Sequence, residues 1–178
     1  MLSVCHHHLL LFLTFPNKGR SVKPGGWVEF QDYDGYPISE DGSLEGTALK
    51  KYYDEVYSAF EEAGCEIRPG PKLEQWFRDA GFVNIHVEKF VIPYGVWPKD
   101  RHLVSFPLVS EQTMDIDLFV QKEIGAWNQA QAEAAGFEGF AMAALTRYKQ
   151  WTKEEVYLLA SQARADGRKR DIHMLVNL

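Results

Sequence analysis

The order of strand-like and helix-like segments restricts the fold of this 178-residue chain more than any other feature. A segment of β-formers at residues 27–31 precedes two helical patterns, and an alternating segment follows at residues 83–88. More helical patterns then lead to a last alternation at residues 172–176. Such an order is typical of layered α/β proteins and does not fit a helical bundle or an all-β sandwich. We therefore predict an α/β fold.

Several helical patterns carry their own boundary signals. The first has apolar residues at helical spacing and a stop at Gly64. The second begins near Pro71 and ends at Gly81. Thr152 and Glu155 have the spacing of a capping box, which predicts a helix from this point. Alanine-rich helices are also expected over residues 122–135 and 137–149.

The charge balance argues against partners that need a basic surface. The chain has a formal net charge of -6 and a pI near 5.5. Nucleic acids and anionic membranes both select basic faces, so neither is an expected partner. The one dense basic run, residues 168–170, is interpreted as a solvated helix end.

The amino-terminal apolar run is too short to cross a membrane. Residues 9–15 (LLLFLTF) fall well below the roughly 20 residues that a spanning helix needs. No Lys or Arg precedes this run and no small-residue cleavage site follows it, so it does not match a secretory signal. Two cysteines, Cys5 and Cys65, are far fewer than small secreted domains use. We expect a protein of the cytoplasm or the nucleus.

Metal binding is not expected. The cysteines lack the C-x-x-C spacing of zinc sites. The three histidines at residues 6–8 are consecutive, so they cannot all face one ion, and no carboxylate stands near them in the sequence.

Several sequence blocks resemble one enzyme family. Residues 22–31, VKPGGWVEFQ, resemble the segment that leads into the fifth strand of class I S-adenosylmethionine-dependent methyltransferases. The later blocks resemble, in the same order, the second half of fungal members that include regulators and tailoring enzymes of secondary metabolism. The resemblance covers about four-fifths of the chain. The later blocks are DGSLEGTAL, KLEQWFRDAGFVNIHVEKFVIPYGVWPKD, KEIGAWNQ, FEGF and WTKEEVYLLASQAR.

The resemblance implies an incomplete doubly wound, Rossmann-like methyltransferase fold. The strands of this chain would be the fifth, sixth and seventh of that fold, with the seventh antiparallel between the other two. The implied cofactor is S-adenosylmethionine, which such folds hold with a glycine-rich turn after the first strand. Gly25 and Gly26 precede a strand instead, so they do not match that turn. We expect a truncated family member that is inactive alone, with no assignable cofactor-binding residues.

Two segments depart from the family pattern. Residues 1–20 are an apolar leader that we interpret as a replacement edge strand beside residues 27–31, and the methyltransferase-like domain is assigned to residues 21–178. Residues 104–121 separate two family blocks as an atypical insert. The insert begins with Val-Ser and ends with Gln, which the usual first and last bases of an intron can encode. One hypothesis is that both segments are translated introns.

The candidate substrate-binding residues follow strands or flank prolines. Asp32 and Tyr33 follow the strand expected at residues 27–31. The acceptor pocket of such folds lies outside the carboxyl ends of the strands, so these two residues would lie at its rim. Tyr94 and Trp97 lie between two prolines and could form a wall of the same pocket. His173 is either a buried histidine with its hydrogen bonds satisfied or a pocket residue, and the former is more typical. No catalytic residue is assigned.

Two other functions remain open. The chain could be a catalytically silent module that binds a protein, such as an intact homologue. It could also be a small-molecule binder that uses a leftover pocket. The methyl acceptor, a small molecule or a protein, is not identified by the sequence.

Overall fold

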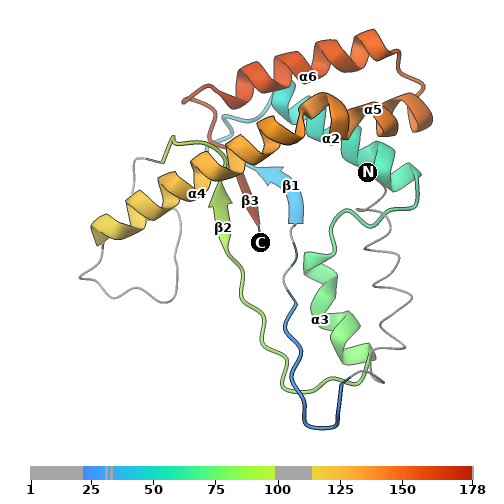
Figure 1. Ribbon diagram of the computed structural model, residues 1–178, viewed down its shortest axis with the longest axis vertical. Coiled ribbons are helices and arrows are strands. Elements are labelled where there is room, and N and C mark those ends of the chain that lie inside the picture. The colour runs from blue at the N-terminus through green and yellow to red at the C-terminus, as the bar shows by residue number, and fades with distance from the viewer. Residues whose placement is uncertain (1–21, 31, 33, 99–113, 178) are drawn as a thin grey trace.

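The computed structural model describes residues 22–30, 32, 34–98 and 114–177 (Figure 1). Five helices and three strands lie in these residues, which confirms the predicted α/β class. Their order is β1 (Asp34–Ile38), α2 (Ala48–Glu62), α3 (Gly70–Asp79), β2 (Val91–Pro93), α4 (Met114–Ala135), α5 (Phe137–Tyr148), α6 (Lys153–Gly167) and β3 (Leu175–Asn177).

The strands form one small sheet in the order β1-β3-β2. β3 is antiparallel to both neighbours, so β1 and β2 run parallel to each other. The last strand therefore lies between the other two, as the family resemblance implies.

β1 contains an irregularity that accommodates a proline. Asp34 pairs with Asn177 and Ile38 pairs with Leu175, so five residues of β1 oppose three of β3. Extra residues on one strand are the mark of a β-bulge, where the strand ladder tolerates a missing N–H. Pro37, which is fully buried, lies in this bulged part.

Two predicted strands are wrong in position. The described residues of 27–31 form no strand, and Trp27 is 90% exposed. Residues 83–88 form no strand either, and Val83 is 80% exposed. The described part of β3 ends at Asn177, which pairs with Asp34 in β1 and with Val91 in β2. The extended segments that precede Asp34 and Val91 therefore have no described strand beside them to pair with. Strand-forming residues need such a partner, because their preference arises largely from cross-strand packing.

The predicted helices are confirmed. Gly64 and Gly81 follow α2 and α3 with φ of 78° and 88°, the left-handed region that glycine adopts without strain. After α3 the chain folds back, because Phe82 donates its N–H to the carbonyl of Phe77 at 3.0 Å. The capping box of α6 is complete: Thr152 accepts from the N–H of Glu155, and the Glu155 carboxylate accepts from the N–H of Thr152.

The core lies among three helices. α2, α5 and α6 pack on one another at one end of the molecule, while α3 lies at the other end beside the extended segments that precede β1 and β2 (Figure 1). α4 packs on β2 and contacts α5. The residues buried at this centre are Leu49, Tyr52, Val56, Ala141, Leu145, Val156 and Ala160.

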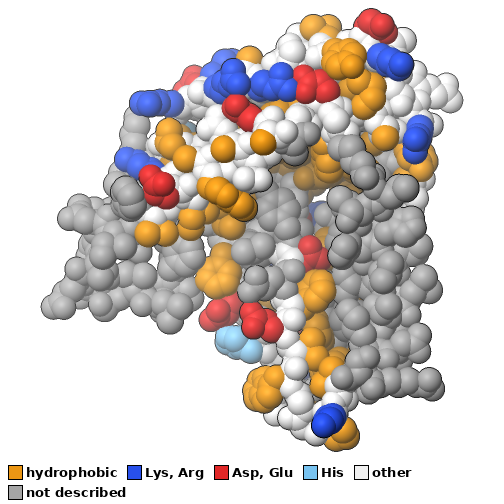
Figure 2. All heavy atoms as spheres, in the orientation of Figure 1, with side chains coloured by type: hydrophobic (Ala, Val, Ile, Leu, Met, Phe, Trp, Pro, Cys, Tyr) orange, Lys and Arg blue, Asp and Glu red, His pale blue; other side chains and the backbone are white. Residues whose placement is uncertain are grey.

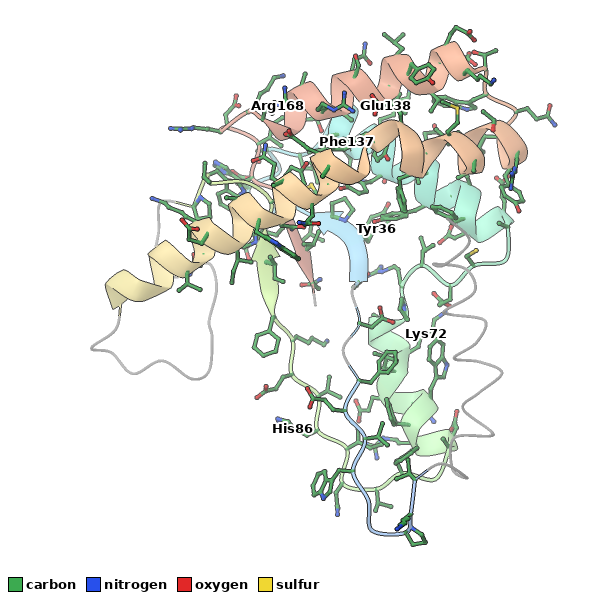
Figure 3. All side chains as sticks on the ribbon, viewed as in Figure 1. Tyr36, Lys72, His86, Phe137, Glu138 and Arg168 are labelled. Carbon is green, nitrogen blue, oxygen red and sulfur yellow. The ribbon has the colours of Figure 1, made fainter. Side chains whose placement is uncertain are left out.

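The basic run at the end of α6 is used in ion pairs. Arg168 donates to both carboxylate oxygens of Glu133 in α4, at 3.1 and 2.9 Å. Lys169 donates to Asp166 at 2.7 Å. Figure 3 shows Arg168 at the helical end of the molecule, where α6 passes α4.

The two segments that depart from the family pattern lie partly or wholly outside the described residues. Residues 1–20, including the suggested replacement edge strand, lie outside the described residues, and so do residues 104–113 of the insert. The remainder of the insert, residues 114–121, is continuous with α4. Among the described helices, none combines the length and the hydrophobicity that a membrane crossing would require.

Candidate functional site

The loops that follow β1 and β2 meet at one edge of the sheet. Since the two strands are parallel, their carboxyl ends share this edge. Open α/β sheets bind ligands in the crevice outside the carboxyl ends of their strands. A cavity of about 240 Å³ lies there. It is lined by Glu40, Asp41, Trp97, His173 and Leu175.

A larger depression of about 520 Å³ covers the first turns of α2 but is a weaker candidate. Its lining comes from residues 45–55 of one helix and the turn before it. The helix N–H groups at this end already have acceptors: Thr47 accepts from Lys50, and Asp166 accepts from Ala48. We therefore place the candidate site at the sheet edge.

His173 and Asp41 form the polar centre of the sheet-edge cavity. His173 Nδ1 lies 2.5 Å from Asp41 Oδ2, although the two residues are 132 positions apart in the chain. The backbone N–H of His173 also donates to Ser43 Oγ at 2.8 Å. These two bonds attach His173, two positions before β3, to the loop just after β1.

The hydrogen bonds around Asp41 keep it ionised. Ser43, through its hydroxyl and its backbone N–H, and Ser39, through its hydroxyl, hold the pKa of the Asp41 carboxyl well below its usual range. An ionised carboxylate only accepts hydrogen bonds, so the hydrogen bond assigns the His173 proton to Nδ1. In the neutral imidazole, Nε2 then carries the free lone pair. Nε2 has no hydrogen-bond partner among the described residues.

Trp97 supplies the aromatic wall of the cavity. Its ring stacks on the His173 ring, with centroids 4.5 Å apart and planes inclined by 27°. Trp97 is only 6% exposed, so the imidazole lies against a fixed surface. Within the described part of the chain, no hydrogen-bond partner is found for the buried indole Nε1.

The other predicted aromatic residue is buried beside the cavity. Tyr94 is 3% exposed, and its backbone N–H donates to the Met174 carbonyl at 2.9 Å. Its ring packs against α6, where a Cβ on Gly167 would come within 3.1 Å of Tyr94 Cε1. Tyr94 is not among the described residues that line the cavity, whereas Trp97 is.

Asp32 lies at the other end of β1. The structure has this strand at Asp34–Ile38, so Asp32 precedes its amino end and the cavity adjoins its carboxyl end. The prediction that Asp32 lies at the rim of the pocket, at the carboxyl end of a strand, is therefore wrong, because it depended on a strand at residues 27–31. Tyr33 lies outside the described residues.

The sequence prediction missed Asp41 and favoured another environment for His173. The His173 side chain is 34% exposed and lines the cavity, so it is not a fully buried histidine. One signal was available, since Asp41 and Ser43 follow a β-rich segment in a turn-forming loop. Their pairing with His173 depends on the strand order, which periodicity does not reveal.

Gly25 and Gly26 form a tight turn before an extended segment. The N–H of Gly26 donates to Lys23 O at 2.8 Å, which closes a turn. A Cβ on Gly26 would lie 2.9 Å from this oxygen and from Val22 Cγ1, so the close approach is within the turn itself. Gly25 has a φ of 82° and open space around it. These two glycines therefore shape a turn that precedes an extended segment.

Among the residues that the structure describes, no group of three or more His, Cys, Asp and Glu side chains is arranged to hold a metal ion.

The chain is similar to fungal proteins of secondary metabolism. It is 31% identical over 155 residues to Methyltransferase pytC of Aspergillus terreus, covering 86% of this chain and 42% of that protein. It is 28% identical to Secondary metabolism regulator laeA of Monascus pilosus, covering 85% of this chain and 36% of that protein. It is 25% identical to Probable methyltransferase tdiE of Emericella nidulans, with coverages of 86% and 43%.

No family model matches the chain, and no solved structure matches it significantly. The chain spans less than half the length of the relatives it matches, between 36% and 43% of the three named above. The matches confirm the resemblance found in the sequence. The chain is therefore homologous to part of the fungal secondary-metabolism methyltransferases.

Proposed function

We propose that this chain is the carboxyl-terminal, acceptor-binding part of a fungal class I methyltransferase and that it does not transfer methyl groups alone. The observation that carries the proposal is the cavity at the shared carboxyl edge of β1 and β2. Acceptor groups enter at this edge in doubly wound folds. Trp97, His173 and Asp41 are the residues that would meet the acceptor, which we expect to be a small molecule or a protein side chain.

The proposal that the chain transfers no methyl groups alone rests on Gly25 and Gly26. A doubly wound fold holds its nucleotide-like cofactor where backbone can approach the ligand after a strand. The turn at Gly25 and Gly26 precedes an extended segment and closes on its own atoms. We therefore expect S-adenosylmethionine to need residues that the described part of the chain does not supply, such as those of an intact homologue.

Calorimetric titration with S-adenosylmethionine tests this proposal. The chain alone should give no binding heat, whereas the chain co-expressed with the amino-terminal part of methyltransferase pytC should bind the cofactor. Micromolar binding by the chain alone would show that the cofactor site is misplaced. No binding by the reconstituted pair would contradict the assignment of this chain as the complementary part of such an enzyme.

A catalytically silent interaction module is the second candidate, favoured by an exposed apolar surface. The extended segments before β1 and β2 carry Trp27 and Val83, which are 90% and 80% exposed, and Val28 and Val87, which are 40% and 47% exposed. Figure 2 shows apolar side chains gathered on this lower part of the molecule. Patches of this kind often mark protein-binding surfaces.

Gel filtration with an intact homologue, such as Monascus pilosus laeA, tests this second candidate. The wild-type chain should co-elute with the homologue, and the double variant W27S/V83S should not. L158S is a matched control, because Leu158 is 60% exposed on α6 and lies outside these segments. Equal co-elution of all three forms, or of none, would contradict a docking role for the extended segments.

We also propose that the protein is located in the cytoplasm or the nucleus. Residues 1–20 would form a leader, and residues 21–178 would form the methyltransferase-like domain. Sequencing the spliced transcript tests whether residues 1–20 and 104–121 are translated introns. Their absence from the mature message would support that hypothesis, and their retention would refute it.

A further inference from the structure

We propose that His173 is a proton acceptor for the acidic hydroxyl of a planar, single-ring ligand bound in the sheet-edge cavity. This inference rests on the proposed function, because it takes the cavity to be the acceptor-binding site. It adds the class of ligand, a phenol or an enol, and names the atom that receives its proton.

The direction of the His173–Asp41 hydrogen bond supports this role. Nδ1 is engaged by Asp41 at 2.5 Å, and the second oxygen of Asp41 accepts from Ser39 Oγ at 2.7 Å. A carboxylate that accepts a hydrogen bond from Nδ1–H fixes the imidazole tautomer and stabilises the imidazolium when Nε2 gains a proton. The arrangement leaves Nε2 available to a ligand, since none of the described residues bonds to it.

The proton transfer is balanced within the site. The ligand O–H bond breaks, its electron pair stays on oxygen, and an N–H bond forms at Nε2. The product is an oxyanion beside an imidazolium, whose charge faces the Asp41 carboxylate. A positioned base makes an oxygen nucleophilic in this way in many enzymes.

The size and surface of the cavity select the rest of the ligand. Its volume of about 240 Å³ is below the roughly 300 Å³ at which sites for drug-sized ligands begin, so one ring with short substituents suits it. The His173 ring, held flat against the buried Trp97 ring, lines the cavity, and Leu175 adds apolar surface. Flat apolar walls favour planar ligands over branched ones.

The test uses 4-nitrophenol, whose phenolate absorbs visible light. The pH is set just below the probe's own pKa and at or above the ordinary imidazole pKa of about 6.5, so that most of the free probe is protonated while the imidazole can still be neutral. Binding to the full chain is followed by quenching of tryptophan fluorescence, and proton transfer is followed by phenolate absorbance. We expect the wild-type chain to raise the phenolate fraction of bound probe severalfold. The H173Q variant should bind the probe without this rise.

Two controls, one variant and one ligand, test whether the effect depends on His173 and on the hydroxyl of the probe. H86Q should behave as wild type, because His86 is 83% exposed on its side chain and lies on the extended segment before β2 (Figure 3). The methyl ether 4-nitroanisole should bind the wild-type chain without changing its histidines. D41N should retain binding but reduce proton transfer, since its amide fixes the imidazole less well and stabilises the imidazolium less.

A measurement on the wild-type chain alone guards against misfolded variants. Nitrogen NMR of labelled histidine should show one neutral histidine with its proton on Nδ1, and this signal should become imidazolium when 4-nitrophenol is added. 4-Nitroanisole should leave the tautomer unchanged. The absence of such a signal change would overturn the inference.

The outcomes distinguish this inference from the proposed function. Equal phenolate formation in wild type and H173Q, or binding of both probes without proton transfer, would overturn the role of His173 and leave the acceptor pocket in place. Failure of both probes to bind would overturn the acceptor pocket itself. Preference for 4-nitrobenzylammonium over 4-nitrophenol would also overturn the inference, by showing that Glu40 and Asp41 select a cation.

Discussion

Asp166, in the last turn of α6, accepts a hydrogen bond of 2.7 Å from the backbone N–H of Ala48, the first residue of α2. The same carboxylate oxygen accepts from the N–H of Leu49 at 3.3 Å. The first N–H groups of a helix have no partner within the helix, so an anion is favourable there. Its other oxygen accepts from Lys169 at 2.7 Å. These contacts explain an aspartate that is only 9% exposed at the edge of the core.

Substituting Asp166 by alanine should destabilise the protein substantially. D166A leaves the N–H groups of Ala48 and Leu49 without their acceptor, which costs about 1–3 kcal/mol in the free energy of unfolding. Urea denaturation followed by circular dichroism measures this loss. D79A is the control, because Asp79 is exposed and, among the described residues, bonds only to Gln75 on its own helix. Equal stability of the two variants would rule out the capping role of Asp166.

The same contacts predict an acid-dependent loss of stability. Burial raises the pKa of Asp166, but Lys169 and the N–H groups of Ala48 and Leu49 outweigh this effect and bring the pKa below its ordinary 3.8. A pKa lower in the folded state means that the contribution is present above pH 3.8 and is lost as pH falls through the folded value. The free energy of unfolding, measured in urea from about pH 5 to about pH 2, should fall less steeply in D166N than in wild type.

Removing one hydroxyl from the core should lower the free energy of unfolding by less than the loss of Asp166 does. Tyr52 is 2% exposed, and its Oη donates to the Phe137 carbonyl at 2.8 Å. Y52F keeps the ring packing on Phe137 but removes this bond, so the free energy of unfolding should fall by about 0.5–1.5 kcal/mol. Y157F should change it by less than about 0.5 kcal/mol, because Tyr157 is 55% exposed. A Y52F variant as stable as wild type would mean that the hydroxyl contributes nothing net.

The helices were predictable from the sequence because their signals are local. The capping box at Thr152 and Glu155 lies within one helical turn, and Gly64 and Gly81 end α2 and α3 through their own φ angles. Strand positions were not predictable in the same way. The segment with Trp27 is rich in β-formers, yet the pairing partners in β3 lie opposite residues from Asp34 onward.

The candidate site was predictable in part for the same reason. Trp97 stands out locally as an aromatic residue between prolines, and it lines the cavity. Asp41 and His173 come together only because β3 enters the sheet between β1 and β2, and this order depends on long-range pairing. Nothing in the spacing of two residues 132 positions apart indicates such a contact.

Gly125 of α4 controls the position of the loop that carries Trp97. The Gly95 N–H donates to the Gly125 carbonyl at 2.9 Å, and a Cβ on Gly125 would lie 2.1 Å from Gly95 O. G125A should therefore displace this loop, lower the free energy of unfolding by about 1–3 kcal/mol and weaken 4-nitrophenol binding. G70A is the control, since its Cβ would meet, among the described residues, only Asp34 Cβ at 3.6 Å. If G125A binds the probe as G70A does, the position of Trp97 does not depend on this helix contact.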